Sequence, residues 1–369
     1  MLVIHDAPFP IGWLAWPIAP PQWSVVFAIK ATFAIPPEGG VCRWVDDPPL
    51  VTGDLYEDDD ATRGLRYPTD LAIAKPRGEV TLVGTAHAPR GRAVRSMVAG
   101  FRFGAVHKEV AVVGDRMWKP GLLGGMSEPA PFTSMPLTWD RAFGGKGNPD
   151  NPIGRGIQPV MVGGEPRVVL PNLEDRAAML KNSQARVSPT GTGPIPPTWS
   201  PRAARAGTYD AIWHATRWPW FPKDLDFRYF NAAPEDQQIV GFWKGDESFE
   251  LQHLHPEHAR IQARLPGVRP RCVTAVRRGQ DAKIEEVALS LDTVTLDADA
   301  LTVTLVWRGN RPVSDEHHPE LEQVFVTEEP VDAPRSQTDV ARAYHAELQR
   351  RQDEESAFQA DPMPRGPRG

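Results

Sequence analysis

The sequence predicts a mainly β protein: sandwich-like antiparallel sheets with long, ordered loops rich in Pro and Gly, a few short helices and a C-terminal helix. Three observations support this fold class. The 369 residues include 39 Pro and 31 Gly, which limit the length of helices and of central strands. The 12 Trp supply large apolar rings that can hold loops against a core. Residues 25–35 and 301–308 alternate with the period of two that half-buried strands show.

The longest strand pattern covers residues 25–35 and ends before Pro36. Lys30 and Thr32 are predicted on the outer face of this strand. Its inner face carries Val25, Phe27, Ile29, Ala31, Phe33 and Ile35. The last strand pattern, over residues 301–308, directs inward Leu301, Val303, Leu305 and Trp307. These two apolar sets form the predicted centre of the core.

The remaining predicted elements are shorter. Period-two alternation indicates further strands over residues 80–84, 97–103, 110–113, 239–243, 249–251 and 285–297. Gly104 marks the turn of a hairpin, and residues 297–300 have the composition of a second hairpin connection. A short helix begins at residues 207–210 and ends before Pro219.

Between residues 126 and 201 the strand pattern gives way to Pro- and Gly-rich sequence, interrupted by one predicted helix near 173–181. A structureless stretch of this length counts against a compact domain, but its aromatic residues indicate that it is held against a core; these are Phe132, Trp139, Phe143 and Trp199. We therefore predict one β-rich domain over residues 1–333, whose loop-rich central part near 126–235 could separate two lobes. Residues 334–369 are predicted to form a C-terminal helix, with Val340, Tyr344 and Leu348 on one stripe, followed by a disordered end.

Composition and charge exclude several classes of protein. The formal net charge of −6 gives no basic field for general binding to nucleic acid or to anionic membranes, and no apolar run reaches the 18 residues of a membrane span. Cys42 and Cys272 have none of the spacings of a zinc site or a disulfide scaffold, so both are expected to be reduced and structural. The N-terminal sequence lacks the regions of a signal peptide. We therefore expect a cytoplasmic protein with no nucleic-acid and no membrane partner.

No motif supports catalysis or a bound cofactor. The Gly-Gly-Lys-Gly run at residues 144–147 lacks the spacing and the Ser or Thr of a P-loop, and residues 154–156 lack the third Gly of a dinucleotide fingerprint. These glycines are expected to serve loop conformations with positive φ. The nucleophile pattern Gly-x-Ser-x-Gly does not occur. The sequence therefore predicts a protein that is not an enzyme and needs no cofactor.

Two clusters could bind metal but have simpler interpretations. His253, His255 and His258 have ligand-like spacing, yet no fourth ligand can be named, so surface or core histidines are favoured and no metal is expected. The four adjacent acidic residues 57–60 could hold a cation. A solvated loop is the simpler explanation of this acidic run.

The segment 218–222 places three aromatic rings between prolines. Such rings form a sugar-stacking platform, a protein-binding hot spot or part of a core. Nearby Asp224 and Asp226 could supply acid-base or cation chemistry, although capping of loop amides is the commoner role. We expect at least one of the three rings to be exposed.

Several strings, read in order, resemble the bacterial domain-of-unknown-function 2169 family. They are Lys30-Ala31-Thr32-Phe33, Gly114-Asp115-Arg116-Met117-Trp118, Pro131-Phe132, Met135-Pro136-Leu137, Arg141-Ala142-Phe143-Gly144-Gly145, Asn151-Pro152-Ile153-Gly154-Arg155-Gly156, Pro171-Asn172-Leu173, residues 199–202, 207–219, 230–238 and 245–247. Together they extend from about residue 27 to residue 305. Leu225 departs from the pattern, which has Phe there.

The resemblance implies a non-catalytic adaptor or chaperone that loads a toxic effector onto the type VI secretion spike. The implied partners are the effector, through its N-terminal or spike-tip region, and the spike protein. Glycine-, asparagine- and aspartate-rich strings would fix the loops that present the binding surface. The partner-binding candidates are Trp218, Trp220, Phe221, Asn151, Arg155, Tyr209 and Asp210. The alternative is a carbohydrate-active enzyme or sugar-binding protein that uses Trp218 and Trp220 with Asp224 and Asp226.

Overall fold

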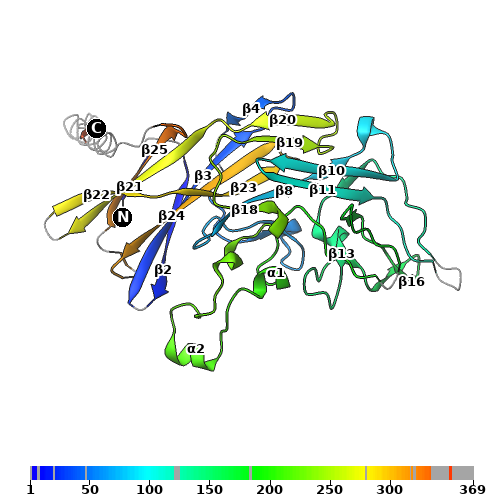
Figure 1. Cartoon of the computed structure of the whole chain (residues 1–369), viewed down its shortest axis with the longest axis horizontal. Coiled ribbons are helices and arrows are strands. Elements are labelled where there is room, and N and C mark those ends of the chain that lie inside the picture. Colours follow the sequence, from blue (N-terminus) through cyan, green and yellow to red (C-terminus); the bar gives the residue numbers. More distant parts are fainter. Residues whose placement is uncertain are drawn as a thin grey trace, which may run out of the picture.

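The protein is built mainly from β-strands, with three large sheets and two short α-helices in its described part (Figure 1). The computed structural model describes residues 2–5, 9–19, 21–45, 48–119, 125–182, 185–278, 281–315, 317–318, 321–333 and 349–350. The predicted C-terminal helix, with Val340, Tyr344 and Leu348, lies outside these residues, apart from a helical fragment at residues 349–350. The mainly β fold class is confirmed.

A seven-stranded sheet forms the centre of the molecule. Its order is β18 (Gln238–Val240), β8 (Arg77–Val83), β23 (Ser290–Asp297), β24 (Thr302–Val313), β3 (Gln22–Ala34) and β2 (Ile11–Ala19), with β5 (Arg43–Trp44) also paired to β3. The two longest of these strands, β3 and β24, are antiparallel neighbours, so that Phe33 pairs with Val303. β8 and β23 run parallel. The sheet is therefore mixed and not purely antiparallel.

Two further sheets share the core with the central sheet. The six-stranded sheet has the order β17 (Leu173–Glu174), β11 (Val106–Val113), β10 (Ser96–Phe103), β19 (Ser248–Gln252), β20 (Arg260–Arg264) and β4 (Gly40–Val41). The four-stranded sheet has the order β1 (Leu2–His5), β25 (Leu321–Pro330), β21 (Val268–Arg278) and β22 (Asp281–Val287). One continuous cluster of buried apolar side chains joins all three sheets, including Phe33, Phe103 and Val324.

The remaining elements are short two-stranded ladders, helices and turns outside the three large sheets. The small ladders pair β6 (Leu55–Tyr56) with β7 (Leu65–Tyr67), β9 (Thr85–His87) with β12 (Ser134–Pro136), β13 (Phe143–Gly144) with β14 (Arg155–Gly156), and β15 (Pro159–Val162) with β16 (Glu165–Val168). The helices are α1 (Ser200–Ala203) and α2 (Ala211–Thr216). Single 3₁₀ turns are η1 (Glu57–Asp59), η2 (Pro89–Gly91), η3 (Trp139–Arg141), η4 (Phe227–Phe230) and η5 (Glu235–Gln237).

Several predicted elements are confirmed. The hairpin β10–β11 turns at Gly104, and β23 and β24 are joined through residues 298–301. The predicted inner face is buried along its length, from Val25 to Phe33 in β3 and at Ile35 directly after it. Val303, Leu305 and Trp307 of β24 are also buried, whereas Leu301 is only partly buried because it lies in the turn before the strand.

Three expectations about elements were wrong. Lys30 and Thr32 are buried, because the loop around residues 48–75 covers the face of β3 that was predicted to be exposed. The helix near 173–181 does not form; Leu173 and Glu174 instead pair with β11, and the buried carboxylate of Glu174 accepts the Leu180 N–H. The strand predicted over residues 285–297 is two strands, β22 and β23, which belong to different sheets.

Candidate functional site

One segment, residues 207–230, projects away from the sheets with α2 at its tip (Figure 1). We call this segment the aromatic arm. Asp210 is the N-cap of α2, and its carboxylate accepts the Trp213 backbone N–H at 2.8 Å. A side-chain cap of this kind satisfies a backbone donor that the helix itself cannot. Asp210, one of the partner-binding candidates, therefore has a structural task in starting the helix.

Hydrogen bonds brace the arm from within. The Trp213 indole N–H donates to the carbonyl of Trp220 at 2.9 Å. The Arg217 Nε donates to the carbonyl of Phe221 at 2.9 Å. At the base of the arm, the Asp224 carboxylate accepts both the backbone N–H and the hydroxyl of Thr208, at 3.1 and 2.7 Å. These bonds hold both limbs of the arm in one conformation, even though α2 alone is too short to be stable.

The arm exposes several large apolar side chains. Tyr209, Ile212 and Trp218 are 52%, 71% and 64% exposed. Trp220 and Phe221 are half-buried, and the Phe221 ring lies 5.9 Å from that of Trp16 on the adjoining strand β2. The expectation that at least one ring of the segment 218–222 is exposed is confirmed for Trp218.

Asp224 and Asp226 are placed as loop-capping groups. Asp224 is bonded by Thr208, and these hydrogen bonds lower the pKa of its carboxyl. Asp226 caps η4, and its hydrogen bonds and ion pair with Arg228 lower the pKa of its carboxyl in the same direction. Each carboxylate is therefore held in its ionised form by a separate local partner. This is the geometry expected for capping of loop amides.

Two partner-binding candidates lie in a different loop and face inward. Asn151 is fully buried, and its Nδ2 donates to the carbonyls of Trp139 and Phe143 at 2.8 and 3.1 Å. Arg155 is half-buried; its guanidinium donates to the Asp140 carbonyl at 2.8 Å and to the Asn172 side chain at 3.0 Å. The fully buried side chain of Asn151 cannot contact a partner directly, so its role is to fix the loop.

A third loop is fixed by a buried ion pair. Lys75 Nζ lies 2.5 Å from Glu79 Oε1 on β8, while Glu79 Oε2 accepts the Asn231 side chain and the Ala233 N–H. Burial alone would raise the pKa of Glu79, but Lys75 and these hydrogen bonds outweigh it and the pKa is lowered. Gln237 extends the network, because its Nε2 donates to the carbonyls of Val80 and Thr192. Polar residues of the string 230–238 thus tie a loop to the sheet, as the resemblance implied.

The three histidines lie in the turn after β19. His253 Nδ1 is 2.8 Å from the Val98 carbonyl, whereas His255 Nδ1 accepts the backbone N–H of Glu257 and of His258. Burial, together with the neighbouring His258, lowers the pKa of His255. Nowhere in the described ranges do three or more His, Cys, Asp or Glu side chains gather as they would around a metal ion.

The remaining loop motifs have local partners. In the acidic run, Glu57 pairs with Arg66 and Asp58 with Arg63, and the exposed Asp60 accepts the Thr62 N–H. Positive φ values are present at Gly144, Gly145, Gly147 and Gly156, whereas Gly154, for which a positive φ was also expected, does not have one.

The exposed apolar hairpin β15–β16 was not predicted from the sequence. Val160, Met161 and Val162 are 50%, 70% and 37% exposed. The Gly163-Gly164 pair between two short β-prone runs was a usable signal for a hairpin. Nothing in the pattern indicated that the apolar side chains would point to solvent.

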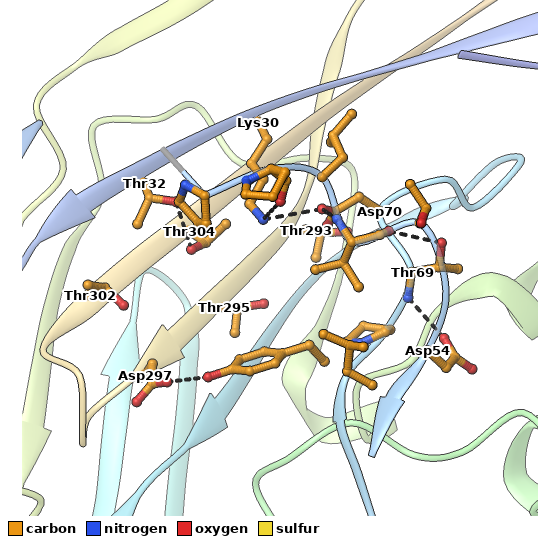
Figure 2. Close-up of a pocket in the computed structure, with 18 of the residues that line it drawn as sticks. Lys30, Thr32, Asp54, Thr69, Asp70, Thr293, Thr295, Asp297, Thr302 and Thr304 are labelled. Atoms are coloured by element: carbon orange, nitrogen blue, oxygen red, sulfur yellow. Dashed lines mark hydrogen bonds and ion pairs between the residues drawn. The ribbon is translucent and has the colours of Figure 1, made fainter. Parts of the chain in front are cut away.

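A cavity of about 800 Å³, also not predicted from the sequence, lies beneath the loop around residues 48–70. Figure 2 shows its floor, where side chains of β3, β23 and β24 point toward this loop. The Tyr67 hydroxyl donates to Asp297 at one side of the cavity. Burial and this bond raise the pKa of Tyr67 to about 12. The polar residues at alternate positions of β3 and β24 were the available signal, but the sequence does not say which loop covers them.

The fold and the braced loops define a class: a β-rich, loop-elaborated protein that presents a rigid apolar arm. Residues 22–308 match the family described as "Uncharacterized protein conserved in bacteria" (DUF2169). Because this match spans most of the chain, the protein belongs to that family. No curated protein and no solved structure matches the chain. Among the helices of the described segments, none combines the length and the apolar character needed to cross a membrane.

Proposed function

We propose that this protein is a non-catalytic adaptor or chaperone, which binds a type VI secretion effector and helps to load it onto the secretion spike. The resemblance of its ordered strings to adaptor-like proteins supplies the class of partner. The observation that carries the proposal is the aromatic arm. Its side chains Tyr209, Ile212 and Trp218 are exposed, and hydrogen bonds within the arm hold its backbone in place.

The arm has the properties of a protein-binding anchor. Large exposed apolar side chains are unfavourable in water unless a partner covers them, and aromatic anchors dominate the energy of many interfaces. Because the Trp213 and Arg217 bonds already hold the backbone, little conformational entropy is lost when a partner binds. The proposed partner surface is therefore apolar and complementary to Ile212 and Trp218. We assign it to the N-terminal or spike-tip region of the effector.

Co-purification with candidate effectors encoded in the same genome tests this proposal. Trp218→Ala and Ile212→Ala are each expected to weaken capture of the effector at least tenfold, with an unchanged melting temperature. Met161→Ala is the matched control, because Met161 is equally exposed on the β15–β16 hairpin outside the arm.

Two results would count against the role of the arm. Capture that survives both arm variants would exclude it as the anchor, and loss of capture together with a lower melting temperature would indicate a structural role. Glycan binding that is lost in Asp224→Asn would instead favour the carbohydrate alternative.

A further inference from the structure

The cavity of about 800 Å³ has a floor of hydroxyl groups. Thr32 on β3, Thr304 on β24 and Thr295 on β23 lie in one row across three adjacent strands, since Thr32 pairs with Thr304 and Thr304 with Thr295. Thr302 lies beside this row on β24 and also lines the cavity (Figure 2). Directly opposed side chains on one sheet face lie close enough to contact the same ligand group.

The hydroxyl row has an open position in its middle. The Thr32 and Thr304 hydroxyls are 3.2 Å apart, and the Thr295 hydroxyl accepts a hydrogen bond from the Thr81 hydroxyl on the far side at 3.4 Å. Within the described residues no hydrogen bond joins Thr295 to Thr304. Each hydroxyl has one donor and two acceptor positions, so Thr295 and Thr304 retain capacity for a ligand oxygen placed between them.

The opposite wall of the cavity is apolar. It is formed by the loop that covers the sheet, and its apolar members are Val45, Pro48, Pro49, Leu50, Val51, Leu55 and Pro68. A volume of this size is within the range of small-molecule sites. A ligand that fills it would contact hydrocarbon on one side and hydroxyl groups on the other.

The charged groups of the lining are balanced. Three cations and three carboxylates line the cavity: Lys30, Lys75, Arg308, Asp54, Asp70 and Asp297. The cations have partners, because Lys30 lies 3.4 Å from Asp70, Lys75 pairs with Glu79, and Arg308 pairs with Asp292.

The carboxylates are also engaged. Asp297 accepts the Tyr67 hydroxyl, and Asp54 accepts the Thr69 N–H at 2.9 Å. An anionic ligand would therefore lose its hydration without gaining an unpaired cation, which is costly.

We propose that this cavity binds an uncharged amphiphile, with its alkyl or acyl chain under the Pro- and Leu-rich loop and a hydroxyl-bearing head over Thr295, Thr302 and Thr304. Monoacylglycerols have this chemistry. This inference is independent of the adaptor role, which depends on the arm and not on the cavity.

Calorimetric titration with three probes that share an eight-carbon chain tests the assignment. The probes are 1-octanoylglycerol, octanoate and octylammonium, each kept below its micelle-forming concentration at neutral pH. The glycerol ester is expected to bind at least tenfold more tightly than either ion. Equal or tighter binding of an ion, or no binding of the ester, would overturn the proposal. Tight binding of octylammonium would indicate that its ammonium group pairs with Asp54.

Two variants locate the binding. Thr304→Val removes one hydroxyl at nearly constant volume and should weaken binding of the ester at least threefold, whereas Leu50→Trp should abolish it by filling the cavity. Thr216→Val, on the exposed face of α2, is the control and should change nothing. If Thr304→Val lowers the melting temperature, Thr295→Val replaces it. Unchanged affinity in the folded hydroxyl variant would refute the proposed head-group site.

Discussion

Lys75 and Glu79 form an ion pair of 2.5 Å from which water is almost completely excluded, since their side chains are 2% and 0% exposed. The pair is surrounded by hydrogen bonds, with Thr293 accepting from Lys75 and with Asn231 and Ala233 donating to Glu79. A buried pair of this kind is costly to break, because the remaining charge has no solvent to replace its partner.

The first prediction concerns this pair. Glu79→Gln leaves the Lys75 ammonium buried without its carboxylate, so the free energy of unfolding should fall by about 3–5 kcal/mol. Urea denaturation measures this change. Glu235→Gln is the control: Glu235 pairs with Arg77 at the surface, where such pairs contribute about 0–1 kcal/mol. A loss below about 1 kcal/mol in Glu79→Gln would show that the pair is not formed as described.

The second prediction concerns pH. The pKa of Glu79 is lowered in the folded protein relative to its ordinary value of 4.5. The stabilisation by its ionised form is therefore complete above pH 4.5 and is lost as the pH falls through the lower, folded-state pKa. The stability difference between the wild type and Glu79→Gln should shrink in that acid range, as followed by urea denaturation at several pH values. A difference that stays constant below pH 4.5 would contradict the assignment.

The third prediction concerns the two thiols. Cys42 and Cys272 are free and buried, and desolvation raises the pKa of each to about 12. Because the thiolate is the reactive form, neither should react with Ellman's reagent at pH 8 in the native protein. Both should react after denaturation in guanidinium chloride. Rapid labelling of the native protein would mean that one thiol is accessible.

The fourth prediction concerns the loop around Asn151. A Cβ at Gly154 would lie only 2.5 Å from Asn151 Nδ2, so the backbone is packed tightly around this amide. Asn151→Ala leaves the buried carbonyls of Trp139 and Phe143 without that donor and should cost about 1–3 kcal/mol in stability. Asn148→Ala, three residues earlier and half-buried, should cost clearly less. Equal losses of stability in the two variants would contradict the inference that Asn151 fixes this loop.

The fifth prediction compares two leucines of one strand region. Leu305 is fully buried, so Leu305→Ala should lower stability by about 2–5 kcal/mol. Leu301 lies in the turn with φ 51° and is only partly buried, and its replacement by Ala should cost less. Thermal and urea unfolding measure both changes. A larger loss at Leu301 would contradict the observed burial.

Local patterns were sufficient for the elements whose own residues decide their structure. The alternation in β3 and β24, the Gly104 turn and the start of the short helix α2 were all predictable from short stretches of sequence. Period-two alternation cannot show what covers the second face of a strand. That is why Lys30 and Thr32 were placed in solvent although a loop buries them.

Prediction of the candidate site from the sequence was limited in a similar way. The exposure of Trp218 could be predicted from the proline-flanked aromatic segment in which it lies. The burial of Asn151 could not be predicted from its motif, because a polar side chain that holds loops together looks the same in sequence as an exposed one. The helix expected near 173–181 failed for a related reason: tertiary partners of Glu174 outweighed local helix propensity. The cavity could not be predicted, because it forms only where one loop packs on three strands that are distant in sequence.

The pairing of β3 with β24 also constrains how the protein is made. A ribosome releases β3 early, but its partner strand β24 (Thr302–Val313) is complete only after 313 residues have been translated. During that interval the edge of β3 that pairs with β24 has no native neighbour, and unpaired strand edges of this kind favour aggregation. We therefore expect that the nascent chain must be shielded, or must remain unfolded, until residue 313 has left the exit tunnel. Synthesis rate and chaperone supply should consequently limit the yield of this protein in a foreign host.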